Sequence, residues 1–170
     1  MIQLGDICTK SSSSIAQKDL ENCDSIYPIY GASGLIKYVD FYQQENPYVV
    51  VVKDGAGVGR VMQLPAKSSI IGTIQYIIPN EGISVHYMAY AMEHMNLAKY
   101  YTGATIPHIY FKDYCKESLQ DHSLDEQRQL CGMKLSTYRK ASITRGFSAS
   151  ALKKAILCTL ERAPSSALQR

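Results

Sequence analysis

The chain has 170 residues, of which 46% are hydrophobic and 19% are charged, a size and composition that suit one globular domain with an appendage. No run of about 18 apolar residues occurs, and the N-terminus lacks the charged, apolar and small residues of a signal peptide in their usual order. Membrane insertion and secretion are therefore not expected, and the sequence predicts a cytoplasmic protein.

The net charge of +3 is unevenly distributed along the chain. Residues 1–125 contain nine Lys and Arg against thirteen Asp and Glu, a balance of −4, whereas residues 126–170 contain nine against two, a balance of +7. A nucleic acid could therefore bind the first part of the chain only through a local basic patch.

The first half of the chain has the pattern of β-structure. A polar opening with Leu4-Gly5-Asp6 predicts a short element and a loop, after which residues 27–79 become strand-like. The expected strands are a buried β-branched run and two segments that follow it, separated from the run by a glycine-rich turn: Tyr48–Lys53, Val58–Leu64 and Ile70–Ile78.

Two helical regions follow. Ser84 is placed to cap a helix that extends to about Tyr101, with Gly103 beyond its end. One face of this helix is apolar and is expected to face the core: Val85, Met88, Ala91, Met92 and Met95. A second helical region begins near Leu124, with Asp125 and Glu126 suited to a helix N-terminus.

This second region is interrupted by Gly132 and Gly146 and contains an amphipathic segment at Ala151–Arg162. We expect an α+β fold with one globular domain over residues 1–122, containing a mixed or antiparallel sheet and a packed helix. A helical, coiled-coil-like dimerisation or spacer region is expected over residues 123–163, and a disordered end over 164–170.

Patterns typical of enzymes and metal sites are weak. The five cysteines are scattered without a CxxC pair, as expected for reduced thiols, and the four histidines lack a metal-ligand spacing. The glycine-rich segment Asp54–Arg60 superficially resembles a phosphate-binding loop, but strand-like sequence follows it instead of a helix. We therefore expect no catalytic residue and no metal.

Two blocks instead suggest a surface that binds a ligand. Gly31–Asp40 and Gly103–Lys112 each place Gly and small hydroxyl residues before aromatic, β-branched and Lys residues. Glycine allows backbone to approach a ligand closely, and the polar side chains can then contact it. A simple turn remains an equal alternative for Gly31 and Gly34.

Taken in order, the blocks resemble a target recognition domain of the DNA-specificity subunit of type I restriction–modification systems. The resemblance covers residue 2 to about 130 and rests on five segments: Leu4-Gly5-Asp6, Tyr27–Gly34, Val49–Gly59, Gly103–Ile109 and Ser123–Gln127. Two segments depart from the family pattern. Val52-Lys53 stands where the family has Gly-Arg, and Ser123-Leu124 stands where it has Pro-Leu.

The resemblance implies a non-catalytic specificity subunit that binds double-stranded DNA and docks modification and restriction subunits. S-adenosylmethionine would bind the modification subunit, so no cofactor is expected on this chain. Family members carry two recognition domains separated by long helices, whereas this chain has one. It is therefore predicted to be a half-size member that reads half of a bipartite target and pairs as a homodimer.

Base edges are read by fixed donors and acceptors, and phosphates by cations, hydroxyls and amides. The residues expected to bind DNA are Ser33, Lys37, Tyr38, Lys53, Arg60, Thr105, His108 and Lys112. The residues expected in the dimer or partner interface are Leu130, Leu135, Leu152, Ile156 and Leu160. Two alternatives stay open: a packed, hydrogen-bonded His108, and solvated surface charges at Lys37, Lys53, Arg60 and Lys112. The alternative function is a degenerate or truncated subunit that acts as a protein-interaction module without specific DNA binding.

Overall fold

The computed structural model describes residues 1–20 and 25–132, and the chain divides into two units, Met1–Gln127 and Arg128–Arg170. The first unit is described below. Of the predicted interface, only Leu130 falls within the described residues, where it is half-buried in a helical segment, residues 124–132. The remaining predicted interface residues, Leu135, Leu152, Ile156 and Leu160, and the predicted disordered end lie outside the described residues.

A four-stranded antiparallel sheet forms the centre of the domain, with strand order β2-β8-β5-β6. Its strands are β2 (Cys8–Ser12), β8 (Ile74–Pro79), β5 (Tyr48–Val52) and β6 (Val61–Leu64). All five residues of β5 are buried, as their continuous apolar run predicts. Because side chains alternate along a strand, Val49 and Val51 join one hydrophobic cluster, and Val50 and Val52 join a second.

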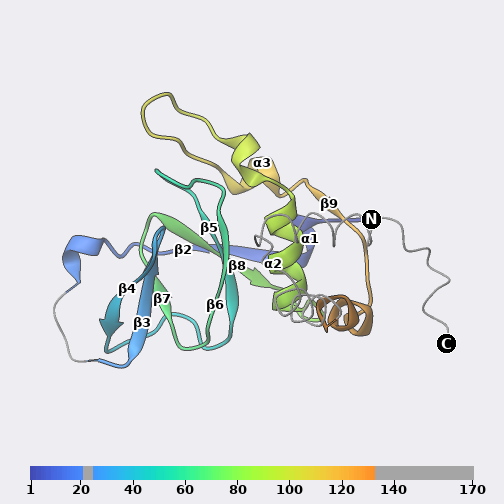
Figure 1. Ribbon diagram of the computed structural model, residues 1–170, viewed down its shortest axis with the longest axis horizontal. Coiled ribbons are helices and arrows are strands. Elements are labelled where there is room, and N and C mark those ends of the chain that lie inside the picture. The colour runs from blue at the N-terminus through green and yellow to red at the C-terminus, as the bar shows by residue number, and fades with distance from the viewer. Residues whose placement is uncertain (21–24, 133–170) are drawn as a thin grey trace, which may run out of the picture. The chain divides into compact units, whose positions relative to one another are not determined.

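A second sheet has the order β4-β3-β7 and mixes strand directions. β3 (Tyr27–Gly31) forms an antiparallel hairpin with β4 (Gly34–Val39) and pairs in parallel with the short β7 (Ser69–Ile70). Figure 1 shows this sheet at one end of the domain, away from α2. The predicted α+β class with a mixed or antiparallel sheet is therefore confirmed for the described residues.

Helix α2 (Val85–His94) packs on the cluster that contains Val49 and Val51. The Ser84 side chain accepts a hydrogen bond from the Tyr87 backbone amide, which confirms the predicted cap. The predicted apolar face is also confirmed, since all five of its residues pack in this cluster. The helix is shorter than predicted because Asn96 adopts a left-handed conformation, with φ 48°, and a 3-10 turn, η2 (Leu97–Tyr100), follows.

The prediction of one continuous strand over Ile70–Ile78 is wrong. A turn at Gly72-Thr73 divides it, and its two parts, β7 and β8, belong to different sheets. The Gly72 amide donates to the Ile15 carbonyl at 2.8 Å, so a distant segment stabilises this corner. No periodicity within the segment reports such a contact.

The predicted strand Val58–Leu64 begins later than expected, at Val61. Gly57 and Gly59 have φ values of 84° and 83°, which end the extended conformation and form a turn. A Cβ atom on Gly59 would lie 2.4 Å from the Ala98 backbone nitrogen, so this turn packs directly on η2.

Three short elements complete the domain. β1 (Ile2–Gln3) pairs with β9 (Ser118–Leu119), which brings residues near the two ends of the domain together. α1 (Leu4–Ile7) buries Leu4 and Ile7 in the same cluster as α2. α3 (Phe111–Tyr114) buries Tyr114, and the 3-10 turn η1 (Gln17–Asp19) is exposed.

Candidate functional site

Three loops that are far apart in the sequence lie together at one edge of the domain. They are the turn 31–34 between β3 and β4, the loop 53–60 between β5 and β6, and the loop 101–110 before α3, and we call them the loop edge. Arg60 Nη1 donates to the Ala32 carbonyl at 3.1 Å, which joins the first two loops. The Gly55 amide donates to the Pro107 carbonyl at 3.0 Å, and Ile109 donates to Lys53 at 3.0 Å, which join the second and third.

The loop 101–110 projects from the domain, as the yellow segment near α3 in Figure 1 shows. Thr102 and His108 exchange two backbone hydrogen bonds of 2.8 Å, which close its base. Gly103 has φ 95°, and a Cβ atom there would lie 2.5 Å from the Ile106 carbonyl oxygen. Glycine is therefore required at this position, and the loop presents Thr105 and Ile106 to solvent.

A carboxylate lies between two of these loops. Asp54 Oδ1 is 2.7 Å from His108 Nδ1, and Asp54 Oδ2 is 3.2 Å from Lys53 Nζ. The Asp54 side chain remains 32% exposed, so it is held by two partners and still faces solvent. No pattern in the sequence singles out Asp54, because its contact with His108 spans 54 positions in the chain.

The structure brings five of the eight predicted DNA-binding residues to the loop edge. Ser33, Arg60 and Thr105 are exposed there, whereas Lys53 and His108 are half-buried and contact Asp54. Within the described part of the chain, Arg60 takes part in no ion pair, and its guanidinium group lies over Gly57, where a Cβ atom would be 3.1 Å from Nη2.

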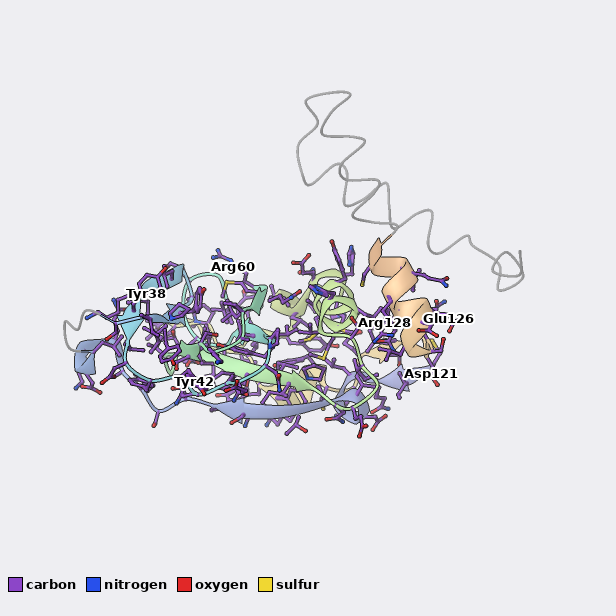
Figure 2. The ribbon with its side chains drawn as sticks, turned by 90° about the horizontal axis from the view of Figure 1, so that it is seen from below. Tyr38, Tyr42, Arg60, Asp121, Glu126 and Arg128 are labelled. Carbon is purple, nitrogen blue, oxygen red and sulfur yellow. The ribbon has the colours of Figure 1, made fainter. Side chains whose placement is uncertain are left out.

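The other three predicted residues lie beside this edge. Tyr38 is exposed on β4, and Figure 2 shows it on the same side of the domain as Arg60. Lys37 is half-buried and its Nζ donates to the Leu20 carbonyl at 3.0 Å. Lys112 lies on α3, with its Nζ 5.4 Å from the centre of the Tyr110 ring. The Lys37 ammonium is thus engaged in a contact within the domain.

The block Ser123–Gln127 has a structural role in the domain. Ser123 and Glu126 form a capping box, because the Ser123 amide donates to Glu126 Oε2 at 2.8 Å and the Glu126 amide lies 3.4 Å from Ser123 Oγ. The hydrogen bond from the Ser123 backbone is the main cause of a lowered pKa for Glu126. The prediction that Glu126 suits a helix N-terminus is confirmed.

The Gln127 side chain, which is 1% exposed, joins this helix start to α2. Its Oε1 accepts from the Ser84 amide at 2.8 Å, and its Nε2 donates to His122 at 2.8 Å and to Gly82 at 3.4 Å. Figure 2 places Glu126 at the opposite end of the domain from Tyr38, with Arg60 between them. The loop edge and the helix start are therefore separate parts of one domain.

Cys8 and Cys115 are free thiols. Burial raises the pKa of Cys8 to about 12, and its Sγ donates to the Leu4 carbonyl at 3.1 Å. Among residues 1–20 and 25–132, no three His, Cys, Asp or Glu side chains are grouped so that they could hold a metal ion. In the same residues, no helix has the length and apolar character needed to cross a membrane.

The chain folds as an α+β domain in which hydrogen bonds join the turn 31–34, the loop 53–60 and the loop 101–110 at one edge. Residues 1–131 match the family described as type I restriction modification DNA specificity domain. The chain therefore belongs to this family, and the resemblance noted from the sequence is confirmed.

Solved structures support the same fold at low sequence identity. The S subunit of a type I restriction–modification system from M. genitalium has a TM-score of 0.65 and 14% identity, over 81% of this chain and 38% of that one. The HsdS subunit from Thermoanaerobacter tengcongensis has a TM-score of 0.55 and 13% identity, over 94% and 43%.

A structure described by complex assembly and conformational transition of the type I R-M system has a TM-score of 0.61 and 16% identity, over 93% and 40%. The chain thus spans about two fifths of the length of the subunits that it matches. No curated protein matches the sequence.

Proposed function

We propose that the loop edge reads one half of a bipartite DNA target on behalf of a type I restriction–modification complex. The observation that carries this proposal is the convergence of turn 31–34, loop 53–60 and loop 101–110 in a domain of the specificity family. Sequence readout requires donors and acceptors at fixed positions, and the hydrogen bonds between these loops would hold them in place.

The charge distribution supports a local contact. Residues 1–125 carry an excess of acidic side chains, so long-range attraction to DNA is weak for this part of the chain. At the loop edge, Arg60 is exposed and joined to a neutral carbonyl, so its charge is available to a phosphate. The Ser33 and Thr105 hydroxyls are also exposed at the loop edge and can serve either phosphates or base edges.

The wider assembly follows from the family. The chain would dock modification and restriction subunits, with S-adenosylmethionine bound by the modification subunit and catalysis performed there. A homodimer joined through residues 123–163 would present two identical loop edges, because an isologous pair repeats the same surface, and its target would be a palindrome with a gap. A cytoplasmic location, where chromosomal DNA is modified, remains a prediction.

The decisive experiment is selection from a randomised duplex DNA pool at two salt concentrations, with and without a cognate modification subunit, followed by sequencing of the bound DNA. Enrichment of a short motif supports the proposal, and inverted repeats of that motif support the homodimer. If no sequence is enriched even with the partner present, the proposal is wrong.

Arg60→Gln and Lys10→Ala make a matched pair for the binding measurement. Arg60 lies at the loop edge next to β6, whereas Lys10 is exposed on β2, at the opposite edge of the four-stranded sheet. Loss of one phosphate contact reduces the magnitude of the negative slope of log K against log salt by about 0.9. This reduction is expected for Arg60→Gln and not for Lys10→Ala. Equal slopes for the two variants would show that Arg60 does not contact the DNA.

A protein-interaction module without specific DNA binding is the second candidate. It is favoured by the acidic excess of residues 1–125 and by the Lys53–Asp54 ion pair, which leaves less positive charge at the loop edge. A salt-insensitive association with the modification subunit, in the absence of DNA enrichment, would support this candidate.

A further inference from the structure

A negative charge in a surface that is proposed to bind DNA requires a structural explanation. Asp54 lies between loop 53–60 and loop 101–110, and its side chain is about one third exposed, at 32%. A carboxylate repels phosphates, so Asp54 would weaken binding if the DNA backbone lay against it. It would strengthen binding if it faced a hydrogen-bond donor on the edge of a base.

The geometry around Asp54 leaves it able to accept such a bond. An ionised carboxylate has about four lone-pair positions on its two oxygens. His108 approaches Oδ1 at 2.7 Å and Lys53 approaches Oδ2 at 3.2 Å, which uses one position on each oxygen. The two partners fix the direction of the carboxylate, and the remaining positions stay open to an external donor.

Lys53 has a second effect on the same group. Its ammonium offsets the Asp54 charge, so a neighbouring phosphate meets an ion pair instead of an isolated negative charge. The structure can thus place a carboxylate near DNA without a large loss of affinity. This arrangement differs from a surface salt bridge in open solvent, because His108 belongs to a separate loop and fixes the carboxylate from a second side.

On the basis of the proposed DNA-reading function, we infer that Asp54 is a specificity-determining residue that accepts a hydrogen bond from the N4 amino group of a cytosine in the major groove. Asp and Glu accept from this amino group, whereas guanine and thymine offer only acceptors and a methyl group at the corresponding positions. Adenine offers an amino group at N6, but its neighbouring N7 acceptor repels a carboxylate, so cytosine is the preferred partner. Lys53 and His108 act as positioning residues, because they hold the carboxylate. The half-site therefore contains a G·C pair at the position that Asp54 faces.

The test compares the pool-selected motifs of the unchanged protein, Asp54→Asn and Glu45→Gln. Asn keeps an oxygen that can accept from His108 but replaces the other oxygen with a donor, which favours a different base. Glu45 is the matched control, since it is an exposed carboxylate paired with Lys67 at 3.8 Å, outside the three loops of the edge. Circular dichroism would establish that each variant is folded.

In Asp54→Asn, the cytosine preference is expected to fall by about tenfold or more at one position, as for one good base contact, with the other positions unchanged. Glu45→Gln should leave the whole motif unchanged. An unchanged motif for Asp54→Asn overturns the inference. An equal loss of base preference at every position also overturns it, because that result would mean that Asp54 only connects two loops.

A second variant keeps the inference testable if Asp54→Asn does not fold. His108→Gln leaves the Asp54 carboxylate in place but loosens it, so it should broaden the preference at that same position and no other. A broadened preference elsewhere, or none, contradicts the inference. Absence of any motif for the unchanged protein is a different result, because it overturns the proposed DNA-reading function and the inference with it.

Discussion

The Gln127 side chain offers a quantitative test of how the domain holds the start of the following helix. The Gln127→Met substitution keeps a long unbranched side chain but removes one hydrogen bond that Gln127 accepts and two that it donates. The Ser84 amide and the His122 carbonyl, both 2.8 Å from the Gln127 amide group, would lose their partner. Gly82 is exposed, so water can replace the longer bond of 3.4 Å.

The expected loss follows from these contacts. A typical net hydrogen bond contributes about 0.5–1.5 kcal/mol, and a buried group left without a partner costs about 1–3 kcal/mol. With two short bonds lost at a side chain that is 1% exposed, we expect Gln127→Met to reduce the free energy of unfolding by about 2–4 kcal/mol. Gln127→Glu should cost a similar amount, because it keeps the acceptor but introduces a charge at a buried site.

The assay is urea unfolding of the full chain followed by circular dichroism, with tyrosine fluorescence as a second probe, since the chain has thirteen Tyr and no Trp. Gln129→Met is the matched control, because Gln129 is exposed in the same helical segment and its substitution should change stability by less than about 0.5 kcal/mol. Hydrogen exchange of the Ser84 amide should also accelerate in Gln127→Met. Equal free energies of unfolding for Gln127→Met and Gln129→Met would refute the reasoning.

Four further predictions concern other sites. Gly59→Ala should destabilise by about 2 kcal/mol more than Gly55→Ala in urea unfolding, because both have φ above 80° but only Gly59 contacts Ala98; similar costs would exclude a tight contact with η2. Gly103→Ala should weaken DNA binding in a titration and leave global stability nearly unchanged, since its clash lies within an exposed loop. The Cys8 thiol, with a pKa of about 12, should react with iodoacetamide only as fast as the protein unfolds, which mass spectrometry can measure; rapid labelling of the folded protein would contradict this. Because the folded-state pKa of Glu126 is lowered from 4.5, its stabilising effect is present above that pH and is lost as the pH falls through the folded-state value, so the stability difference between the unchanged protein and Glu126→Gln should shrink in acid.

Local patterns predicted the parts of the fold that depend on local physics. The buried run of β5 and the apolar face of α2 follow from side-chain periodicity, and the Ser84 cap follows from the residue types that suit this position. The errors occurred where distant segments determine the backbone. The Gly72 corner is held by Ile15, and the turn at Gly59 packs on Ala98, so neither strand boundary was visible in its own sequence.

The candidate site shows the same limit. Family resemblance selected Lys53, Arg60 and His108, and the structure brings them to one edge. The resemblance could not select Asp54, whose role depends on a partner 54 positions away. It also did not identify the buried side-chain amide of Gln127, which connects the N-termini of two helices by hydrogen bonds. Both are polar residues whose contacts are set by tertiary structure and not by spacing.

The loop edge and the helix start are stabilised by two separate polar networks. The loop edge is held by Arg60 and Asp54, which are partly or fully exposed, whereas the helix start is held by the buried Gln127. Exposed contacts contribute little to global stability, and buried ones contribute more. Substitutions at the loop edge should therefore alter what the domain binds with little loss of folding stability. Substitutions at Gln127 should instead loosen the helix start and leave the side chains of the loop edge unchanged.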